Sequence, residues 1–146
     1  MTSATKFLRV ILCDDDEDDR FIFTTVLKEF SPGMEVKSVD GADDLLQELK
    51  ELSHPDLIFL DLNMPRKTGK ECLKEIKSHR ELTDLPVIIY STSAGAPDVD
   101  ETYQCGSSLF VQKTTSIDQL QAVFSRIFEM DMRQLLRPSR ENYVIS

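Results

Sequence analysis

Polar side chains follow four of the short apolar runs in the sequence, at the point where each run ends. They are Asp14, Asp15 and Asp16 after the first run, Asp61 and Asn63 after a later one, Ser91 and Thr92 after the next, and Lys113 near the end of the last. In an open parallel sheet the carboxyl ends of the strands lie along one edge, and ligands bind there. If the apolar runs are strands of such a sheet, these side chains converge on one site.

The acidic residues of this set need a counter-charge. Carboxylates that converge at a partly buried edge repel one another unless a cation neutralises them. Oxygen ligands in an open, hydrated site are those that Mg²⁺ prefers. A carboxylate beside Mg²⁺ and a lysine is well placed to attack a phosphoryl group, because that transfer depends mostly on positioning and charge neutralisation. The residues therefore predict a magnesium-dependent aspartyl phosphate.

The elements that would position these residues alternate along the chain. Short apolar runs with β-branched residues predict strands over residues 8–13, 35–39, 57–60, 87–90 and 109–111. Between them, apolar residues recur at helical spacing, and the later helices are predicted to begin near Thr68 and to cover 97–104 and 117–127. This alternation predicts an α/β fold with a five-stranded parallel sheet.

The composition excludes several classes of partner. The chain has 146 residues, 40% of them hydrophobic, and a formal net charge of −9 at pH 7. An acidic surface repels phosphate, so neither duplex DNA nor an anionic membrane is expected as a partner. The apolar runs are far shorter than the roughly 20 residues that span a bilayer, and no signal peptide is evident, so a cytoplasmic location is expected.

Taken together, the strand-end residues resemble the receiver domains of two-component response regulators, of which the bacterial chemotaxis regulator is a single-domain member. The resemblance covers residues 7–130. The residues that carry it are Asp14-Asp15 after an apolar run, Asp61, Asn63 and Pro65 with Gly69 following, Ser91 and Lys113. The resemblance implies a doubly wound, flavodoxin-like (βα)5 fold with strand order 2-1-3-4-5, followed by a C-terminal tail at 131–146 without a separate output domain.

Carried over residue by residue, the resemblance implies how the site binds metal and phosphate. Asp61 is the implied phosphoacceptor. Asp15, Asp61 and the backbone carbonyl of Asn63 are the implied Mg²⁺ ligands, and Asp14 assists through water. Lys113 is implied to pair with the phosphoryl group.

The resemblance also implies a conformational switch. Ser91, with Thr92 beside it, matches the hydroxyl position that moves toward a phosphoryl oxygen after transfer. Phe110 matches an aromatic residue that turns between exposed and buried rotamers. Through these two residues, the new charge would change the conformation of the face made by the fourth helix, fifth strand and fifth helix.

The implied partners are proteins. The phosphoryl group would come from a phosphohistidine on a sensor histidine kinase or a histidine phosphotransfer protein, and a downstream protein target would bind the switched face, through which a homodimer is also expected. The chain is expected to catalyse only its own phosphorylation and dephosphorylation. Residues 131–146 are too few for a DNA-binding output domain, so no direct DNA binding is expected.

The loop after Lys113 departs from the family pattern. Thr114 stands where the family usually has proline, so the Lys113-Thr114 bond is expected to be trans, because a cis bond there costs about 2.5–4 kcal/mol.

Two other segments are interpreted from their composition. The acids from Asp16 to Asp19 are interpreted as a solvated helix cap. The tail either docks on a neighbouring subunit or partner or is a solvated extension, and Met130, Leu135 and Leu136 would extend the last helix.

Two other functions remain open on the sequence. An apolar run followed by Asp14-Asp15-Asp16 also resembles the nucleophile loop of haloacid-dehalogenase-type phosphatases, which would make Asp14 the nucleophile and Asp16 the acid, although Glu17 departs from that pattern. The other alternative is a receiver-shaped module that binds its partner without being phosphorylated. The intact acidic, hydroxyl and lysine positions argue against this module.

Overall fold

The protein folds around a single parallel sheet. The computed structural model describes residues 7, 9–51, 54–136 and 138–145, so Leu8 of the predicted first strand and Arg137 and Ser146 of the tail lie outside the described residues. The strands are β1 (Arg9–Cys13), β2 (Glu35–Val39), β3 (Leu57–Leu60), β4 (Val87–Ser91), β5 (Leu109–Gln112) and β6 (Val144–Ile145). Their order is β2-β1-β3-β4-β5-β6, which confirms the predicted order of the first five strands.

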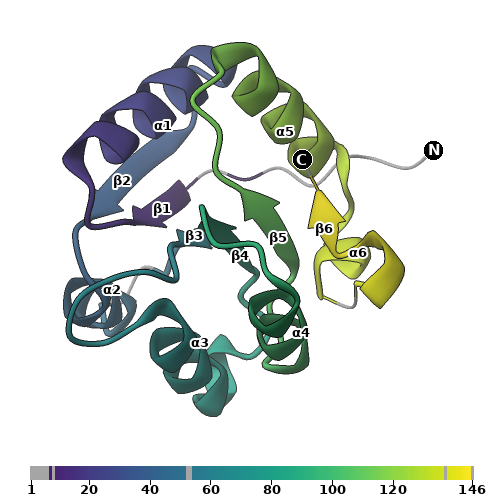
Figure 1. Ribbon diagram of the computed structural model, residues 1–146. Helices are drawn as coiled ribbons and strands as arrows, with labels where there is room; N and C mark the ends of the chain where they lie inside the picture. The colour runs from purple at the N-terminus through teal and green to yellow at the C-terminus, as the bar shows by residue number, and fades with distance from the viewer. Residues whose placement is uncertain (1–6, 8, 52–53, 137, 146) are drawn as a thin grey trace.

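Helices cover both faces of the sheet, as in a doubly wound fold (Figure 1). The helices are α1 (Glu17–Phe30), α2 (Ala42–Leu49), α3 (Gly69–Ser78), α4 (Ala96–Gln104), α5 (Ile117–Glu129) and the short α6 (Met132–Leu136). α1 and α5 lie on one face, and α2, α3 and α4 lie on the other (Figure 1). Within the described ranges, no helix is long and apolar enough to cross a membrane.

The two central strands are apolar throughout because both of their faces are covered. Every residue of β3 and β4 is buried, which is the pattern of a strand between two helical layers. On the α1 and α5 face, Phe23 packs edge-on against Phe59 and Phe124, with ring centroids 4.8 and 5.1 Å away. This packing holds the sheet rigid behind its carboxyl edge, where the polar residues lie.

The C-terminal segment differs from the prediction. Instead of continuing through Met130, α5 ends at Glu129, and the backbone N–H of Met130 caps it by donating to Ile127. The chain then forms α6, a 3-10 turn at Arg140–Asn142 and strand β6, which pairs parallel with β5. Within the described part of the chain, the sheet therefore has six strands rather than five. The sixth satisfies backbone groups that β5 would otherwise present as an open edge.

Tyr143 anchors this C-terminal segment on the domain. Its side chain is fully buried, and its hydroxyl shares a hydrogen bond of 2.6 Å with the Thr102 hydroxyl on α4. The ring packs edge-on against Tyr103 at 5.1 Å and Phe110 at 6.3 Å. Arg140 adds an ion pair to Asp100, with Nη2 2.6 Å from the carboxylate. The segment is packed against α4 and β5 of its own chain, which corrects the interpretation as a solvated extension.

Candidate functional site

Backbone hydrogen bonds extend the sheet past the formal strand ends and place the polar residues side by side. The N–H of Asp61 donates to the carbonyl of Cys13 at 3.0 Å, and the N–H of Lys113 donates to the carbonyl of Ser91 at 2.9 Å. The N–H of Asp14 donates to Val39 on β2 at 3.1 Å. The ends of β1, β3, β4 and β5 thus supply one continuous edge, as the sequence predicts.

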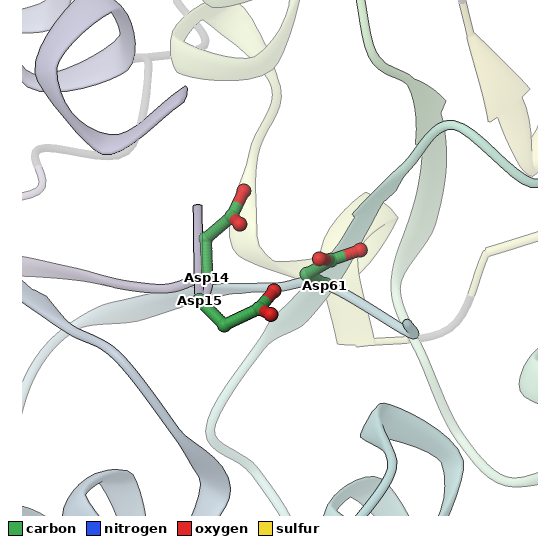
Figure 2. Close-up of side chains that lie close together, drawn as sticks. All are labelled: Asp14, Asp15 and Asp61. Atoms are coloured by element: carbon green, nitrogen blue, oxygen red, sulfur yellow. The ribbon is translucent and has the colours of Figure 1, made fainter. Parts of the chain in front are cut away.

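Three carboxylates meet at this edge. Oxygens of Asp14, Asp15 and Asp61 all lie within 4.8 Å of one another. Asp14 and Asp61 are buried, whereas Asp15 is exposed, and the three side chains lie close together (Figure 2). The site therefore has two fixed inner carboxylates and one that opens to water.

This donor set suits a hard divalent cation. The three acidic side chains offer only oxygen, and the exposed Asp15 leaves room for coordinated water, which Mg²⁺ retains in most protein sites. Asn63 follows Asp61 closely, and its N–H donates to Asp61 Oδ1 at 3.3 Å, so its backbone lies at the same edge. Among the residues that the structure describes, no histidine or cysteine belongs to this cluster, so its donor set does not match the sites that bind soft metals.

Lys113 supplies the positive charge of the site. Its Nζ lies 2.7 Å from Asp14 and 3.4 Å from Asp61, and its side chain is only 10% exposed. Burial lowers the pKa of this ammonium, but hydrogen bonds to Asp14 and Asp19 and the charge of Asp61 outweigh burial and raise it above its usual value. The Nζ lies over the Tyr90 ring, 5.8 Å from its centroid. Lys113 is therefore a fixed cation at physiological pH.

Asp14 is the most perturbed acid of the cluster. Burial raises its pKa to about 6, although hydrogen bonds from Lys113 and from the N–H of Asp16 act in the opposite direction. The N–H of Asp16 donates to Asp14 Oδ1 at 3.0 Å. The Asp14 carboxylate is thus oriented by a lysine on one side and by the backbone on the other.

The first turn of α1 contributes to the site, contrary to the solvated cap that we predicted for all its acids. Asp16 is indeed the cap, and its Oδ1 accepts a hydrogen bond from the N–H of Asp19. The Asp19 side chain, however, reaches Lys113 at 2.8 Å. Asp19 is thus a residue that the sequence analysis missed, because a contact between residues 94 positions apart leaves no local pattern.

The hydroxyl residues lie at the end of β4, the strand next to β3, which Asp61 follows. Ser91 is buried, and its Oγ accepts hydrogen bonds from the Asn63 side-chain amide at 3.4 Å and from the N–H of Ser93 at 3.3 Å. Thr92, the next residue, is exposed. Ser91 is therefore held in the site by Asn63, while Thr92 borders it from the solvent side.

Phe110 is the predicted aromatic switch, and the structure places it in the core. Its side chain is fully buried, and its N–H donates to the carbonyl of Tyr143 at 2.9 Å. The Tyr143 ring lies beside it. The C-terminal segment therefore covers Phe110, and an outward turn of this ring requires Tyr143 to move.

The loop after Lys113 is built without the usual proline. The described residues contain no cis peptide bond, so the Lys113-Thr114 bond is trans, as predicted. The Thr114 hydroxyl accepts a hydrogen bond from the N–H of Ser116 at 3.0 Å and donates to the Gln119 side chain at 2.6 Å. Thr114 therefore organises the entry into α5 through its side chain.

Gly69 lies so close to the backbone of Asp61 and Leu62 that a larger residue does not fit there. A Cβ at this position would lie 2.1 Å from the carbonyl oxygen of Asp61 and 2.6 Å from Cα of Leu62. We expect Gly69→Ala to lower the free energy of unfolding by about 1–3 kcal/mol, as overpacking does, and to displace Asp61.

Urea denaturation of Gly69→Ala measures this cost, and Gly33→Ala is the control. A Cβ at Gly33 would meet nothing within 4 Å, so that variant tests a glycine substitution without a clash. Equal stabilities of the two variants would contradict the close packing of α3 against the site.

Comparison with known proteins identifies relatives of this chain. Residues 10–125 match the sequence profile of the response regulator receiver domain. The response regulator Rcp1 of Synechocystis sp. is 32% identical over 117 residues, a stretch that covers 76% of this chain and 80% of Rcp1. The profile match, over residues 10–125, includes every strand end that contributes to the carboxylate and lysine cluster.

Solved structures show the same fold. The phosphorylated cyanobacterial phytochrome response regulator RcpA superposes with a TM-score of 0.78 at 29% identity, over 92% of this chain and all of RcpA. The Mn²⁺-bound form of Rcp1 superposes with a TM-score of 0.76 at 26% identity, over 84% of this chain and 96% of Rcp1. One relative is thus known with a divalent cation and another in a phosphorylated form.

Proposed function

The chain belongs to the response regulator receiver family, and from this we propose that Asp61 accepts a phosphoryl group from a phosphohistidine on a sensor histidine kinase or a histidine phosphotransfer protein. The observation that carries the proposal is the convergence on Asp61 of Lys113, at 3.4 Å, and of the Asp14 and Asp15 carboxylates, within 4.8 Å. A nucleophilic carboxylate between a lysine and a metal-binding acid pair is the arrangement that phosphoryl transfer requires.

The reaction is a substitution at phosphorus. A carboxylate oxygen of Asp61 forms the new O–P bond as the N–P bond of the phosphohistidine breaks, and the imidazole leaves and takes up a proton. Lys113 neutralises charge on the transferred group, and the buried Ser91 hydroxyl beside Asn63 is available to donate to a phosphoryl oxygen. The chain acts only on its own carboxylate and turns over no other substrate.

The metal would be Mg²⁺, held by Asp15, Asp61 and the backbone carbonyl of Asn63, with Asp14 assisting through water. When bound, Mg²⁺ supplies charge neutralisation for the phosphoryl oxygens. The protein's part is to hold these carboxylates in place, and the bound cation would offset the charge with which they repel the donor. The oxygen-only donor set and the Mn²⁺-bound relative support a divalent cation in this site.

The output is binding to a downstream protein in the cytoplasm, through the face of α4, β5 and α5. Phosphorylation draws Ser91 and Thr92 toward the new charge and changes the packing of Phe110, which biases this face between two states. Leu135 of α6 and Ile145 of β6 belong to the core of the domain, and β6 forms the edge of the sheet beside β5. A homodimer that uses this face would therefore also include β6. The proposed output is contact with a protein and involves neither DNA nor a membrane.

Metal dependence tests this proposal. We expect incubation with acetyl phosphate and Mg²⁺ to add about 80 Da, the mass of one phosphoryl group, to the intact protein. Chelation of divalent cations with EDTA is expected to lower the yield of this adduct at least about tenfold. Without the cation, the negative charge of the three carboxylates is not neutralised and repels the phosphoryl donor. Intact-protein mass spectrometry measures both values.

The same samples decide between this proposal and its alternatives. An adduct of equal yield in EDTA would contradict the metal-assisted reaction. The absence of any adduct, with acetyl phosphate or with phosphorylated histidine phosphotransfer proteins as donors, would favour a module that binds partners without phosphorylation.

A further inference from the structure

Lys113 contacts three acids, and one of them, Asp19, has no role in the proposed reaction. Its Nζ lies 2.7 Å from Asp14, 2.8 Å from Asp19 and 3.4 Å from Asp61. An ammonium has three donor hydrogens, and Asp19 accepts one of them in a hydrogen bond of 2.8 Å. The two shorter contacts are to Asp14 and Asp19, and the longest is to the proposed phosphoacceptor. The ammonium therefore lies closer to Asp14, after β1, and to Asp19, on α1, than to Asp61.

The position of Asp19 is fixed by the backbone of α1. Its N–H donates to the cap residue Asp16 at 3.0 Å. One residue later, the Arg20 guanidinium donates to the carbonyl oxygen of Asp14 at 2.8 Å, which ties the same helical turn to the end of β1. The Asp19 side chain is about one third exposed, so it borders the site from the solvent side. Asp19 thus meets Lys113 from a rigid turn.

We propose that Asp19 is a positioning residue that restrains Lys113 and thereby slows uptake of a phosphoryl group by Asp61. The proposal rests on the function proposed above. A phosphoryl donor carries negative charge, so it is attracted by Lys113 and repelled by the acids around it. Because Asp19 both occupies one donor of Lys113 and offsets its charge, its removal makes the lysine more available to the incoming group.

The test is the rate at which acetyl phosphate labels Asp61 in the presence of Mg²⁺. We expect Asp19→Asn to label about three- to tenfold faster than the parent, because one charge a few ångströms from the lysine is removed in a partly buried site. Asp19→Glu keeps the charge and is expected to restore a rate near that of the parent. A faster rate cannot arise from damage to the fold, and thermal unfolding of each variant verifies that the fold is kept.

Asp18→Asn is the matched control. Asp18 lies on the same turn and is exposed, and its loss changes the net charge of the protein by the same amount. We expect its labelling rate to change less than about twofold, since an exposed charge is screened. A gain equal to that of Asp19→Asn would show a general charge effect and overturn the proposal.

A double substitution tests whether Asp19 acts through Lys113. Asp19→Asn introduced into Lys113→Ala is expected to change the labelling rate no more than Asp18→Asn does in the same background, because the restrained group is gone. The full gain in that background would overturn the proposal.

The outcomes separate this inference from the function on which it rests. If the parent is labelled at Asp61 and Asp19→Asn is labelled at the same rate or more slowly, the role of Asp19 is wrong and the proposed function stands. If the parent acquires no phosphoryl group from any donor, both fail together.

Discussion

Replacement of Asp61 by Asn is expected to abolish the phosphoryl adduct, with labelling by acetyl phosphate falling to below about 1% of the parent. An amide lacks the anionic oxygen that attacks phosphorus, and no neighbouring acid is placed to substitute for it. Asp14 is fully buried and ion-paired with Lys113, and Asp15 lies at the open side of the cluster. Intact-protein mass after a fixed incubation with Mg²⁺ measures the adduct.

Asp14→Asn distinguishes this account from the phosphatase alternative. If Asp61 is the acceptor, Asp14→Asn still forms an adduct, more slowly because a metal-orienting acid is lost. If Asp14 were the nucleophile, as the Asp14-Asp15-Asp16 sequence also allowed, Asp14→Asn would lose the adduct and Asp61→Asn would keep it. That second pattern would contradict the account.

The second large effect is expected at Tyr143, in the segment that was predicted to be a tail. We expect Tyr143→Ala to lower the free energy of unfolding by about 3–5 kcal/mol, the usual cost of truncating a large buried aromatic residue. The side chain is fully buried between α4 and β5, so its loss leaves a cavity beside Phe110 and Tyr103. Urea denaturation followed by circular dichroism measures the change.

Two further variants separate the contribution of the Tyr143 hydroxyl to stability from that of its ring and control for the position. Tyr143→Phe keeps the ring and loses only the hydroxyl bonded to Thr102, so a loss of about 1 kcal/mol is expected. Val144→Ala, at the neighbouring residue and 44% exposed, is the matched control, with an expected change within about 0.5 kcal/mol. A Tyr143→Ala variant as stable as Val144→Ala would show that the C-terminal segment contributes little to the fold.

The sequence predicted the central sheet well because its signals are local. β3 and β4 are apolar throughout, and such runs bounded by polar residues are hard to place anywhere but in a covered sheet. The predicted strands 35–39 and 57–60 agree with β2 and β3 at both ends. The convergence of Asp14, Asp61 and Lys113 followed in turn, because parallel strands end at one edge.

The parts that the sequence did not reveal depend on contacts between distant positions. Strand β6 has only two residues, Val144 and Ile145, and becomes a strand because the edge of β5 is there to pair with it. Tyr143 looks like any aromatic residue near a chain end until Thr102 and Phe110 are placed around it. In the same way, Asp19 looks like a helix-capping acid until Lys113 is brought beside it.

Identification of the modified residue tests the central claim most directly. Borohydride reduces an acyl phosphate, releasing phosphate and converting the acceptor aspartate into homoserine, so the labelled site is recorded permanently. After incubation with acetyl phosphate and Mg²⁺, reduction and peptide mass spectrometry, we expect homoserine at position 61 and nowhere else among the acids of the site. Homoserine at Asp14 or Asp15, with Asp61 unchanged, would contradict the account.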